Sequence, residues 1–534
     1  MRPELQIRNV RLVDGSGAPA RPGCLDISGG RIAAVGGPER PACRVLDGGG
    51  AVACPGFIDA HNHADLAAGS PEEMACMLYQ GVTTCVVGNC GFSAFPAWGE
   101  AGRSYLRYAA GVMGKPRGFS GAADLYEYGQ RLNGASMLVN LASHVGHGML
   151  RAAALGAGDA PADRQGLERM CRLLDALLEQ GAAGLSLGLI YSPGARAGWD
   201  ELAALARTAA RRGKPVAVHL RDEGRGLEDS VEEMLSLARE TGVHIHFSHH
   251  KVMGAAFHGS SARSLALLDR ARTSGLEVSL DAYPYDAGCS TALVLLPPWV
   301  LAQGMEEALA RLERREVRSR IQADLERGIE GWENLVGSCG WKRLEIAALG
   351  SGDPALQGKS LAQLGQIWGI SPLEALARLL VQEGGNVSTT IRGMCQEDVD
   401  RILTWPDTLL GSDGLFAKGS AHPRRYGAFP RFLHSYVMQR GLISLEEAVA
   451  KMTGRTASCF GLRGRGLLRP GYWADVVLFH PEALVDRADY AEPERLAAGI
   501  EHVFVAGVHT LDSGRPTGQY AGRLLTIKSG ENRT

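Results

Sequence analysis

The fold of this chain is decided by the stretch Phe57-Ile58-Asp59-Ala60-His61-Asn62-His63. An apolar run ends there in polar, loop-like sequence, which is the pattern of a buried strand leaving the core. His61 and His63 stand at positions i and i+2, so both imidazoles project to the same face of a strand. Such a pair alone is a weak indication of a metal site, and its meaning depends on the sequence around it.

Seven further apolar runs with strand character follow this stretch along the chain. The eight expected strands are Phe57–His63, Thr83–Val87, Met137–His144, Gly184–Leu187, Pro215–His219, Val243–Ser248, Glu277–Ala282 and Thr408–Gly411. Amphipathic helical stretches such as Gln165–Gln180 and Trp199–Arg212 separate them. Eight strands that alternate with helices predict an α/β fold with a parallel (β/α)8 barrel like that of triosephosphate isomerase.

The two ends of the chain contain short strands and no helical period. We therefore expect residues 1–55 and 468–534 to pair into a small β-sandwich domain, with the catalytic barrel at 56–467. Residues 287 to about 350 are too long for an ordinary loop between the seventh and eighth strands. Because Glu306–Arg327 has helical charge patterning, this segment is interpreted as an inserted helical subdomain.

Composition narrows the class of protein. The chain has 534 residues, 45% apolar and 21% charged, as expected for a globular protein of two to four domain-sized units. With 56 basic against 58 acidic residues it carries no excess positive charge for nucleic acid. Its apolar runs are too short to span a membrane, and no apolar segment follows the N-terminus as in a secretory signal.

Eleven cysteines without regular spacing are not typical of a disulfide framework. Because reduced thiols are typical of the cytosol, we expect a cytoplasmic protein without nucleic-acid or membrane partners. The sequence leaves a homo-oligomer open.

Four other strand ends carry groups that bind metals. These are Cys90 after the second strand, His219 after the fifth, the run Ser248-His249-His250-Lys251 after the sixth and Asp413 after the eighth. A lone cysteine or histidine is usually a packing residue. The active sites of parallel barrels lie at the carboxyl ends of the strands, so these side chains converge, and five such strand ends favour a metal centre.

These motifs resemble those of the amidohydrolase superfamily, and more closely those of its N-acyl-D-amino-acid deacylases (D-aminoacylases). The matching segments run in order over nearly the whole chain: 55–63 PGFIDAHNH, 87–91 VGNCG, 219–223 HLRDE, 248–251 SHHK, 412–414 SDG, 422–424 HPR and 469–476 RPGYWADV. The first and last occur in the superfamily generally. The segment around Cys90 and the SHHK run indicate the deacylase branch.

The resemblance implies a zinc centre. It assigns the tighter zinc to Cys90, His219 and His249, and a neighbouring, weakly or partly occupied site to His61, His63 and Asp413. A thiolate and two imidazoles suit Zn²⁺ and leave a position for water or substrate. His249 is preferred to His250 by the match to the motif, and adjacent strand residues face opposite ways.

The fourth strand departs from the more familiar amidohydrolases, in which a carboxylated lysine there bridges two metals. Residues 184–188 read GLSLG and contain no lysine. This weighs against the hydantoinase and dihydroorotase branches and leaves Cys90 as the bridging ligand. A cyclic-amide hydrolase or a deaminase stays open as the alternative. A non-enzymatic scaffold would have substituted ligands, whereas all six positions here carry competent ones.

The resemblance further implies hydrolysis of a small-molecule substrate, an N-acyl-D-amino acid, to a carboxylate and a free D-amino acid. Asp413 would act as the base and then as the acid. Lys251 and Arg424 would bind the substrate's α-carboxylate, and Tyr191 and Tyr283 would donate hydroxyls. The plainer alternatives are a surface salt bridge for Arg424 and packing for Tyr283.

The segment Cys289–Trp299 after the seventh strand is expected to contact the substrate side chain. It contains no cation. An unpaired buried carboxylate costs several kcal/mol, so we expect a preference for neutral, largely apolar D-side chains over acidic ones. Arg221 is the cation that would weaken this expectation by reaching in from a distance.

Overall fold

Eight parallel strands, in the order of the sequence, form a ring at the centre of the molecule. The computed structural model describes residues 2–114, 121–133, 135–417, 419 and 422–528. The strands are β6 (Phe57–Asp59), β7 (Val82–Val87), β8 (Asn140–Ser143), β10 (Leu185–Gly188), β11 (Val216–His219), β12 (Ile245–Phe247), β13 (Val278–Ala282) and β17 (Thr408–Leu410). Each overlaps a strand expected from the sequence.

The ring closes through backbone contacts at both seams. The two-residue strand β9 (Val145–Gly146) continues from β8 and pairs with β10. At the other seam the Ala60 amide donates to the Leu410 carbonyl over 3.1 Å, next to a bridge between Asn62 and Gly414. The strand β6 ends at Asp59, four residues earlier than expected. His61 and His63 therefore belong to the chain that leaves the strand.

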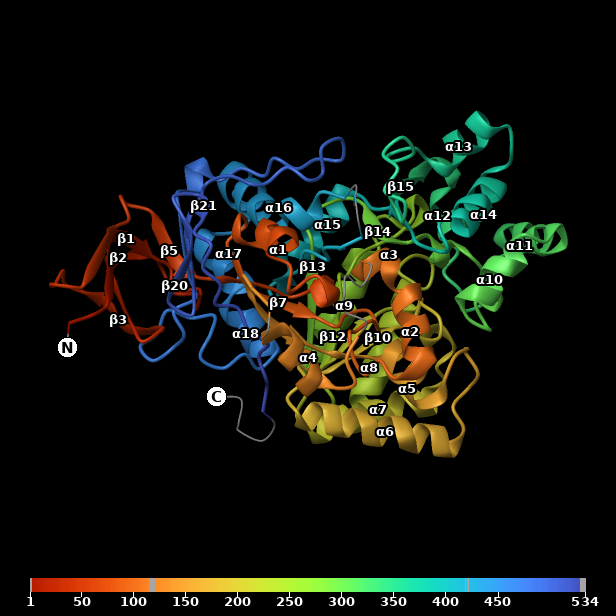
Figure 1. The fold of residues 1–534 in the computed structure, drawn as a ribbon, viewed down its shortest axis with the longest axis horizontal. Coiled ribbons are helices and arrows are strands. Elements are labelled where there is room, and N and C mark those ends of the chain that lie inside the picture. The colour runs from red at the N-terminus through yellow and green to blue at the C-terminus, as the bar shows by residue number, and fades with distance from the viewer. Residues whose placement is uncertain (1, 115–120, 134, 418, 420–421, 529–534) are drawn as a thin grey trace.

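Helices surround the ring (Figure 1). They are α1 (Pro71–Leu78), α2 (Gly99–Tyr108), α3 (Ala110–Met113), α4 (Leu125–Asn133), α5 (His147–Leu155), α6 (Arg164–Glu179), α7 (Trp199–Arg211), α8 (Leu227–Thr241), α9 (Ser261–Thr273), α15 (Gln396–Thr404), α16 (Arg424–Arg431), α17 (Leu445–Met452) and α18 (Gly454–Cys459). In α6 the Asp163 side chain caps the Gly166 amide. Met170, Leu174 and Leu177 then form its buried stripe at helical spacing. None of the described helices combines the length and apolar character that a bilayer-spanning segment requires.

The insertion between β13 and β17 is longer than the expected 287–350 and contains a sheet. Its strands β14 (Gly288–Thr291), β16 (Val387–Ile391) and β15 (Leu344–Leu349) lie side by side and antiparallel. Its helices are α10 (Met305–Leu312), α11 (Arg315–Arg327), α12 (Leu335–Cys339), α13 (Leu361–Trp368) and α14 (Pro372–Gln382). The insertion extends to Ile391 instead of ending near residue 350, because β16 lies between the other two strands of this sheet. The insertion lies at the end of the molecule opposite the chain termini's sheet (Figure 1).

The two terminal segments share one nine-stranded sheet. From the N-terminal side come β1 (Leu5–Leu12), β2 (Arg21–Ser28), β3 (Arg31–Gly37), β4 (Arg44–Asp47) and β5 (Val52–Pro55); from the C-terminal side come β18 (Val476–Phe479), β19 (Ile500–Val505), β20 (Val508–Asp512) and β21 (Arg515–Pro516). The strand β18 pairs antiparallel with β5 and joins the halves. Ile7, Leu25 and Phe504 share its buried core. Met1 and residues 529–534 lie outside the described residues.

The C-terminal tail returns from this sheet to the ring. The Leu525 amide donates to the Leu141 carbonyl over 2.6 Å, and the Ile527 amide donates to the Gly181 carbonyl over 2.8 Å. Ile527 is buried in one apolar cluster with Ile58 and Leu409, which belong to β6 and β17. Part of the segment expected in the small domain therefore packs against the strands that lead to His61, His63 and Asp413.

Candidate metal centre

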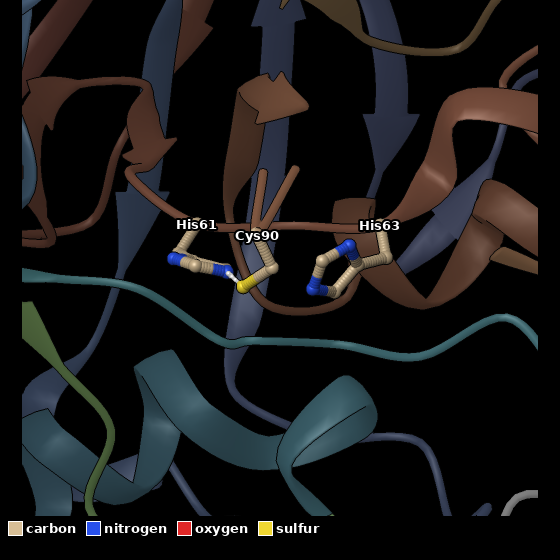
Figure 2. A group of neighbouring side chains, drawn as sticks. All are labelled: His61, His63 and Cys90. Carbon is tan, nitrogen blue, oxygen red and sulfur yellow. Dashed lines mark hydrogen bonds between the residues drawn. The ribbon is translucent and has the colours of Figure 1, made fainter. Parts of the chain in front are cut away.

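The thiol of Cys90 lies at the middle of the six predicted ligands. Its sulfur is 3.3 Å from His61 Nε2 and 3.2 Å from His249 Nε2. Figure 2 shows the rings of His61 and His63 on either side of this sulfur. All six side chains are buried. Cys90 thus belongs to two groups of ligand atoms, one with His61 and His63 and the other with His219 and His249.

The other ligand atoms complete the two groups. His219 Nδ1 lies 2.9 Å from His249 Nε2. Asp413 Oδ1 lies 3.2 Å from His63 Nε2 and 3.6 Å from His61 Nε2. Four-coordinate zinc with bonds near 2.1 Å holds neighbouring nitrogen ligands about 3.4 Å apart, so the donor set and its spacing both fit the ion. The predicted ligands from five strand ends therefore lie close enough together to share a metal ion.

Three of these ligands have an unusual backbone conformation. Cys90, His249 and Asp413 have φ values of 55°, 34° and 48°, in the left-handed region that non-glycine residues rarely adopt. Conformations of this kind cost of order 1–3 kcal/mol each and persist where the surrounding structure enforces them. Here they turn the side chains inward directly after their strands end.

The fourth strand positions the loop that carries Cys90. The Ser186 hydroxyl accepts from the Gly91 amide over 3.0 Å and donates to the Gly88 carbonyl. Gly188 packs so closely that an added Cβ would overlap the Cys90 carbonyl oxygen. Small residues therefore stand on this strand because the Cys90 loop lies directly against it.

Replacing Gly188 with alanine is expected to displace the Cys90 loop. The steric overlap should cost about 1–3 kcal/mol of unfolding free energy and weaken zinc binding roughly 10- to 100-fold. Urea unfolding and competitive zinc titration measure the two effects. Gly198→Ala is the control, because nothing lies within 4 Å of a Cβ added there. Equal zinc affinity in the two variants would contradict this role for Gly188.

Asp281 supports two of the ligands and was not predicted. Its carboxylate accepts from the His249 amide over 3.0 Å and lies 3.4 Å from His61 Nδ1. The second oxygen also lies 2.8 Å from His246 Nε2. Burial alone would raise the pKa of Asp281, but the His61 and His246 rings hold it well below its usual range. The signal for it was a carboxylate inside the apolar run Glu277–Ala282.

His249 and His250 point in different directions. His250 Nε2 lies 2.9 Å from the Ser264 hydroxyl on α9, outside the ring of strands. Two further buried histidines, His144 and His147, follow β8 and make contacts of other kinds. His147 Nε2 lies 2.7 Å from Glu201, and the His144 ring packs on Phe460.

Burial favours the neutral form of three of the predicted ligand imidazoles, those of His63, His219 and His249. It lowers the pKa of His63 to about 4, and it lowers the pKa values of His219 and His249 well below the usual range. Neutral imidazoles present the lone pairs that metals require. Burial raises the pKa of the Cys90 thiol, and the charge of Asp413 raises it further. A bound cation is the partner that would make this buried thiol a thiolate.

Lys251 lies in the cavity beside the ligands, but its ammonium has partners already. Its Nζ donates to Glu223 Oε1 over 2.7 Å and lies 2.7 Å from His249 Nδ1. Glu223, which belongs to the motif at 219–223 and was not predicted as a site residue, is therefore a functional candidate. Its carboxylate also lies 3.3 Å from His249 Nδ1, so it orients a ligand as well as a cation.

Arg424 is buried at the start of α16 and forms an ion pair with Asp413. Its Nη1 lies 2.9 Å from Asp413 Oδ2, and its Nη2 donates to the Cys289 carbonyl over 2.9 Å. The guanidinium stands 4.7 Å from the Tyr283 ring centroid. Burial alone would raise the pKa of Asp413, but Arg424 and the neighbouring histidines hold it well below its usual range. Arg424 is 1% exposed, which excludes the alternative that it forms a salt bridge on the surface.

The two tyrosines predicted to bind substrate, Tyr191 and Tyr283, lie in different environments. The Tyr191 hydroxyl lies 2.9 Å from the Ser290 hydroxyl on β14. Among the described residues, the Tyr283 hydroxyl makes one long contact, of 3.9 Å, with the Met394 sulfur. Both tyrosines line one cavity with Lys251 and four of the predicted ligands, His63, His219, His249 and Asp413.

The same cavity has an apolar wall and an unexpected carboxyl group. The apolar residues that line it include Val112, Ile190, Met253, Val294, Leu335, Ile391 and Leu415. Glu333, from the insertion, also lines it. One of its oxygens accepts from the Glu223 amide over 3.1 Å, and the other has no hydrogen-bond partner in the described part of the chain. Burial, with Glu223 nearby, raises the pKa of Glu333 well above its usual range.

Known proteins are similar to this chain in sequence and in fold. A model of the amidohydrolase family matches residues 44–510. An N-acyl-D-glutamate deacylase of Alcaligenes xylosoxydans xylosoxydans is 37% identical over 98% of this chain and 96% of that one. A D-aminoacylase of the same organism is 35% identical over 98% and 97%.

Solved structures agree with these sequence matches. A crystal structure of N-acyl-D-glutamate deacylase from Bordetella bronchiseptica, complexed with zinc and a phosphonate inhibitor, has a TM-score of 0.83 at 34% identity over 98% of this chain and 100% of that one. A D-hydantoinase structure covers 98% and 99% with a TM-score of 0.54 at 17% identity, so that likeness extends to the fold alone.

Proposed function

The chain belongs to the amidohydrolase family, and we propose that it is a zinc-dependent deacylase that hydrolyses N-acyl-D-amino acids to a carboxylate and a free D-amino acid. The observation that carries the proposal is the buried group of Cys90, His219 and His249, whose thiol and imidazoles converge from three strand ends. Cations for a carboxylate lie in the same site. The similarity to an N-acyl-D-glutamate deacylase and a D-aminoacylase extends over 98% of the chain and supports a linear amide as the substrate.

We assign the tight zinc to Cys90, His219 and His249, and a weaker second ion to His61, His63 and Asp413. The Cys90 sulfur, 3.3 Å from His61 Nε2 and 3.2 Å from His249 Nε2, would serve both groups of ligands. The chemistry that bound zinc supplies is Lewis acidity, which polarises an amide carbonyl and acidifies water. Ser186, Asp281 and Glu223 hold the loops and rings that present these donors.

Asp413 is the proposed acid and base. One of its oxygens faces His63 and the other faces Arg424, so the carboxylate is fixed at the edge of the cavity. It would take the proton from the attacking water and return it to the departing amine nitrogen. Its low pKa keeps it ionised, and therefore ready to accept that proton, at neutral pH.

The α-carboxylate of the substrate is proposed to bind Arg424, Lys251, Tyr191 and Tyr283. Arg424 Nε has no hydrogen-bond partner among the described residues, which leaves a buried donor for a ligand. Lys251 would exchange part of its contact with Glu223 for the substrate. Tyr283 packs its ring on Arg424 and carries its hydroxyl in the cavity.

We predict that N-acetyl-D-leucine or N-acetyl-D-methionine is hydrolysed with a higher kcat/KM than N-acetyl-D-glutamate. The wall of the cavity is apolar, and Glu333 adds an acidic group rather than a cation. Arg221 is held by Glu233 at 3.0 Å and by the Ala195 carbonyl, so it is engaged outside this wall. An unpaired buried carboxylate should cost roughly 100-fold in kcat/KM. Each buried methylene should add about 0.8 kcal/mol of transition-state binding.

Kinetics on a panel of N-acyl-D- and N-acyl-L-amino acids, with zinc content measured on the same sample, tests the proposal. Hydrolysis restricted to the D-series is expected. A cyclic amide and an aminopurine belong in the panel, because turnover of either alone would replace the deacylase by the cyclic-amide hydrolase or the deaminase. A higher kcat/KM on N-acetyl-D-glutamate would contradict the side-chain preference only.

We extend the proposal to the domains and to the location in the cell. Residues 1–55 and 468–534 would form the small β-sandwich, and residues 56–467 the (β/α)8 barrel with its insertion. The pairing of β5 with β18 and the backbone seam between Ala60 and Leu410 support this division. All eleven cysteines are unpaired, which supports the cytoplasm as the compartment.

A further inference from the structure

A second cluster of metal-binding side chains lies on the sheet of the terminal segments, outside the ring of parallel strands. His502 belongs to β19, and His509 and Asp512 belong to β20. His502 Nδ1 is 3.2 Å from His509 Nε2 and 3.3 Å from Asp512 Oδ1. His509 Nε2 is 3.9 Å from the same oxygen. The three ligand atoms therefore form the corners of a small triangle.

A β-bulge brings these side chains to one face. Val503 pairs with Leu511 and Phe504 pairs with His509, so Thr510 is an extra residue in β20. Without it, His509 and Asp512 would stand three positions apart on a regular strand and face opposite sides. Bulges commonly redirect a side chain in this way. The ring of His509 is also fixed, because it stacks on Phe504 with centroids 4.3 Å apart.

The triangle has the dimensions of a coordination site. A point at its centre lies about 2.0 Å from all three atoms, which is the ordinary length of Zn–N and Zn–O bonds. The same spacing is found in the catalytic group, where Cys90 and His249 are 3.2 Å apart. The two imidazoles are nearly buried, with 9% and 8% of their side chains exposed, whereas Asp512 is 46% exposed. The open side leaves room for water as a further ligand.

We propose that His502, His509 and Asp512 form a second, non-catalytic site for a divalent transition-metal ion such as Zn²⁺. Two imidazoles and one carboxylate suit zinc, nickel and copper rather than magnesium or calcium. The ion would join the two strands of the β19–β20 hairpin and stabilise the sheet. This inference is independent of the proposed deacylase activity.

Arg44, on β4, opposes metal binding at this site, so its replacement should make binding tighter. Its Nη2 lies 3.0 Å from His509 Nδ1. A guanidinium only donates, so in the metal-free protein Nδ1 is the acceptor and Nε2 carries the proton. Coordination through Nε2 requires that proton to move to Nδ1, and the Arg44 side chain must then turn away. Replacing Arg44 with glutamine also removes a positive charge, so it should tighten zinc binding roughly fivefold.

The experiment is equilibrium dialysis of the zinc-loaded full-length enzyme against micromolar free Zn²⁺, followed by metal analysis. The variants are His509→Ala, Asp512→Asn and Arg44→Gln. His480→Ala is the matched control, since His480 is a partly exposed histidine near Glu482 and Glu501 on the same sheet. We expect His509→Ala to bind one ion fewer than the wild type and Asp512→Asn to bind it more weakly. His480→Ala should match the wild type, and kcat/KM should be unchanged in all four.

Arg44→Gln keeps the test decisive, because a gain in affinity does not arise from misfolding. Loss of one ion in His509→Ala together with tighter binding in Arg44→Gln supports the site. Equal zinc content in the wild type and His509→Ala overturns it. So does an affinity in Arg44→Gln that is no higher than that of the wild type.

Discussion

Replacing Cys90 with alanine is expected to remove the tightly bound zinc and nearly all activity. Cys90 is the single cysteine in the ligand groups formed by the described residues, so no other thiolate takes its place. Zinc contributes several kcal/mol of transition-state stabilisation in enzymes of this type, so kcat/KM should fall roughly 1000-fold or more. Atomic absorption and steady-state kinetics on the same preparation measure both losses.

Cys85→Ala is the matched control for this variant. Cys85 is a buried cysteine on β7, the strand that leads to Cys90, and it belongs to none of the ligand groups. Its replacement should leave both zinc content and kcat/KM close to those of the wild type. Full zinc retention in Cys90→Ala would refute the ligand assignment, whatever happens to the activity.

The strands and the convergence of the site were accessible from sequence because both depend on local patterns. A run such as Val216-Ala217-Val218-His219 shows its burial and its polar end in four consecutive residues. The rule that active sites lie at the carboxyl ends of barrel strands then brings His219 to Cys90 and His249 without any knowledge of the loops. The family resemblance added which of these groups share an ion.

The sheet in the insertion was not accessible in the same way, because its pairings are non-local. The strand β16 lies about 100 residues after β14, with which it pairs, and its segment Val387–Ile391 has no pattern that specifies this partner. Glu333 was missed for the same reason. Its approach to Glu223 depends on how the insertion folds back over the cavity, and a lone glutamate in the loop between α11 and α12 gives no signal of burial.

The electrostatic state of the site was also only partly predictable. Lys251 was expected to be available for a carboxylate, and the structure pairs it with Glu223 at 2.7 Å. Arg424 was expected to face the substrate, and it also bonds to Asp413 at 2.9 Å. Spacing along the chain showed that these groups would meet. It did not show that each buried cation is balanced by an acid in the free enzyme, which follows from the cost of burying an unpaired charge.

Asp413→Asn is expected to separate chemistry from metal binding. Asparagine has the same shape but cannot accept the water's proton, so kcat should fall roughly 1000-fold, within the range attributed to general acid–base catalysis. Cys90, His219 and His249 do not depend on Asp413 as a ligand, and the tight zinc should stay. Asp65→Asn is the control, because Asp65 is a buried carboxyl group outside all the ligand groups. It should keep both zinc and turnover.

The zinc content of Asp413→Asn decides between two explanations of a lost activity. If zinc stays and kcat falls, the carboxylate moves the proton. If zinc leaves with the activity, Asp413 is needed chiefly to hold metal, and its bond to Arg424 is structural. If kcat stays near that of the wild type, Asp413 is not the acid and base.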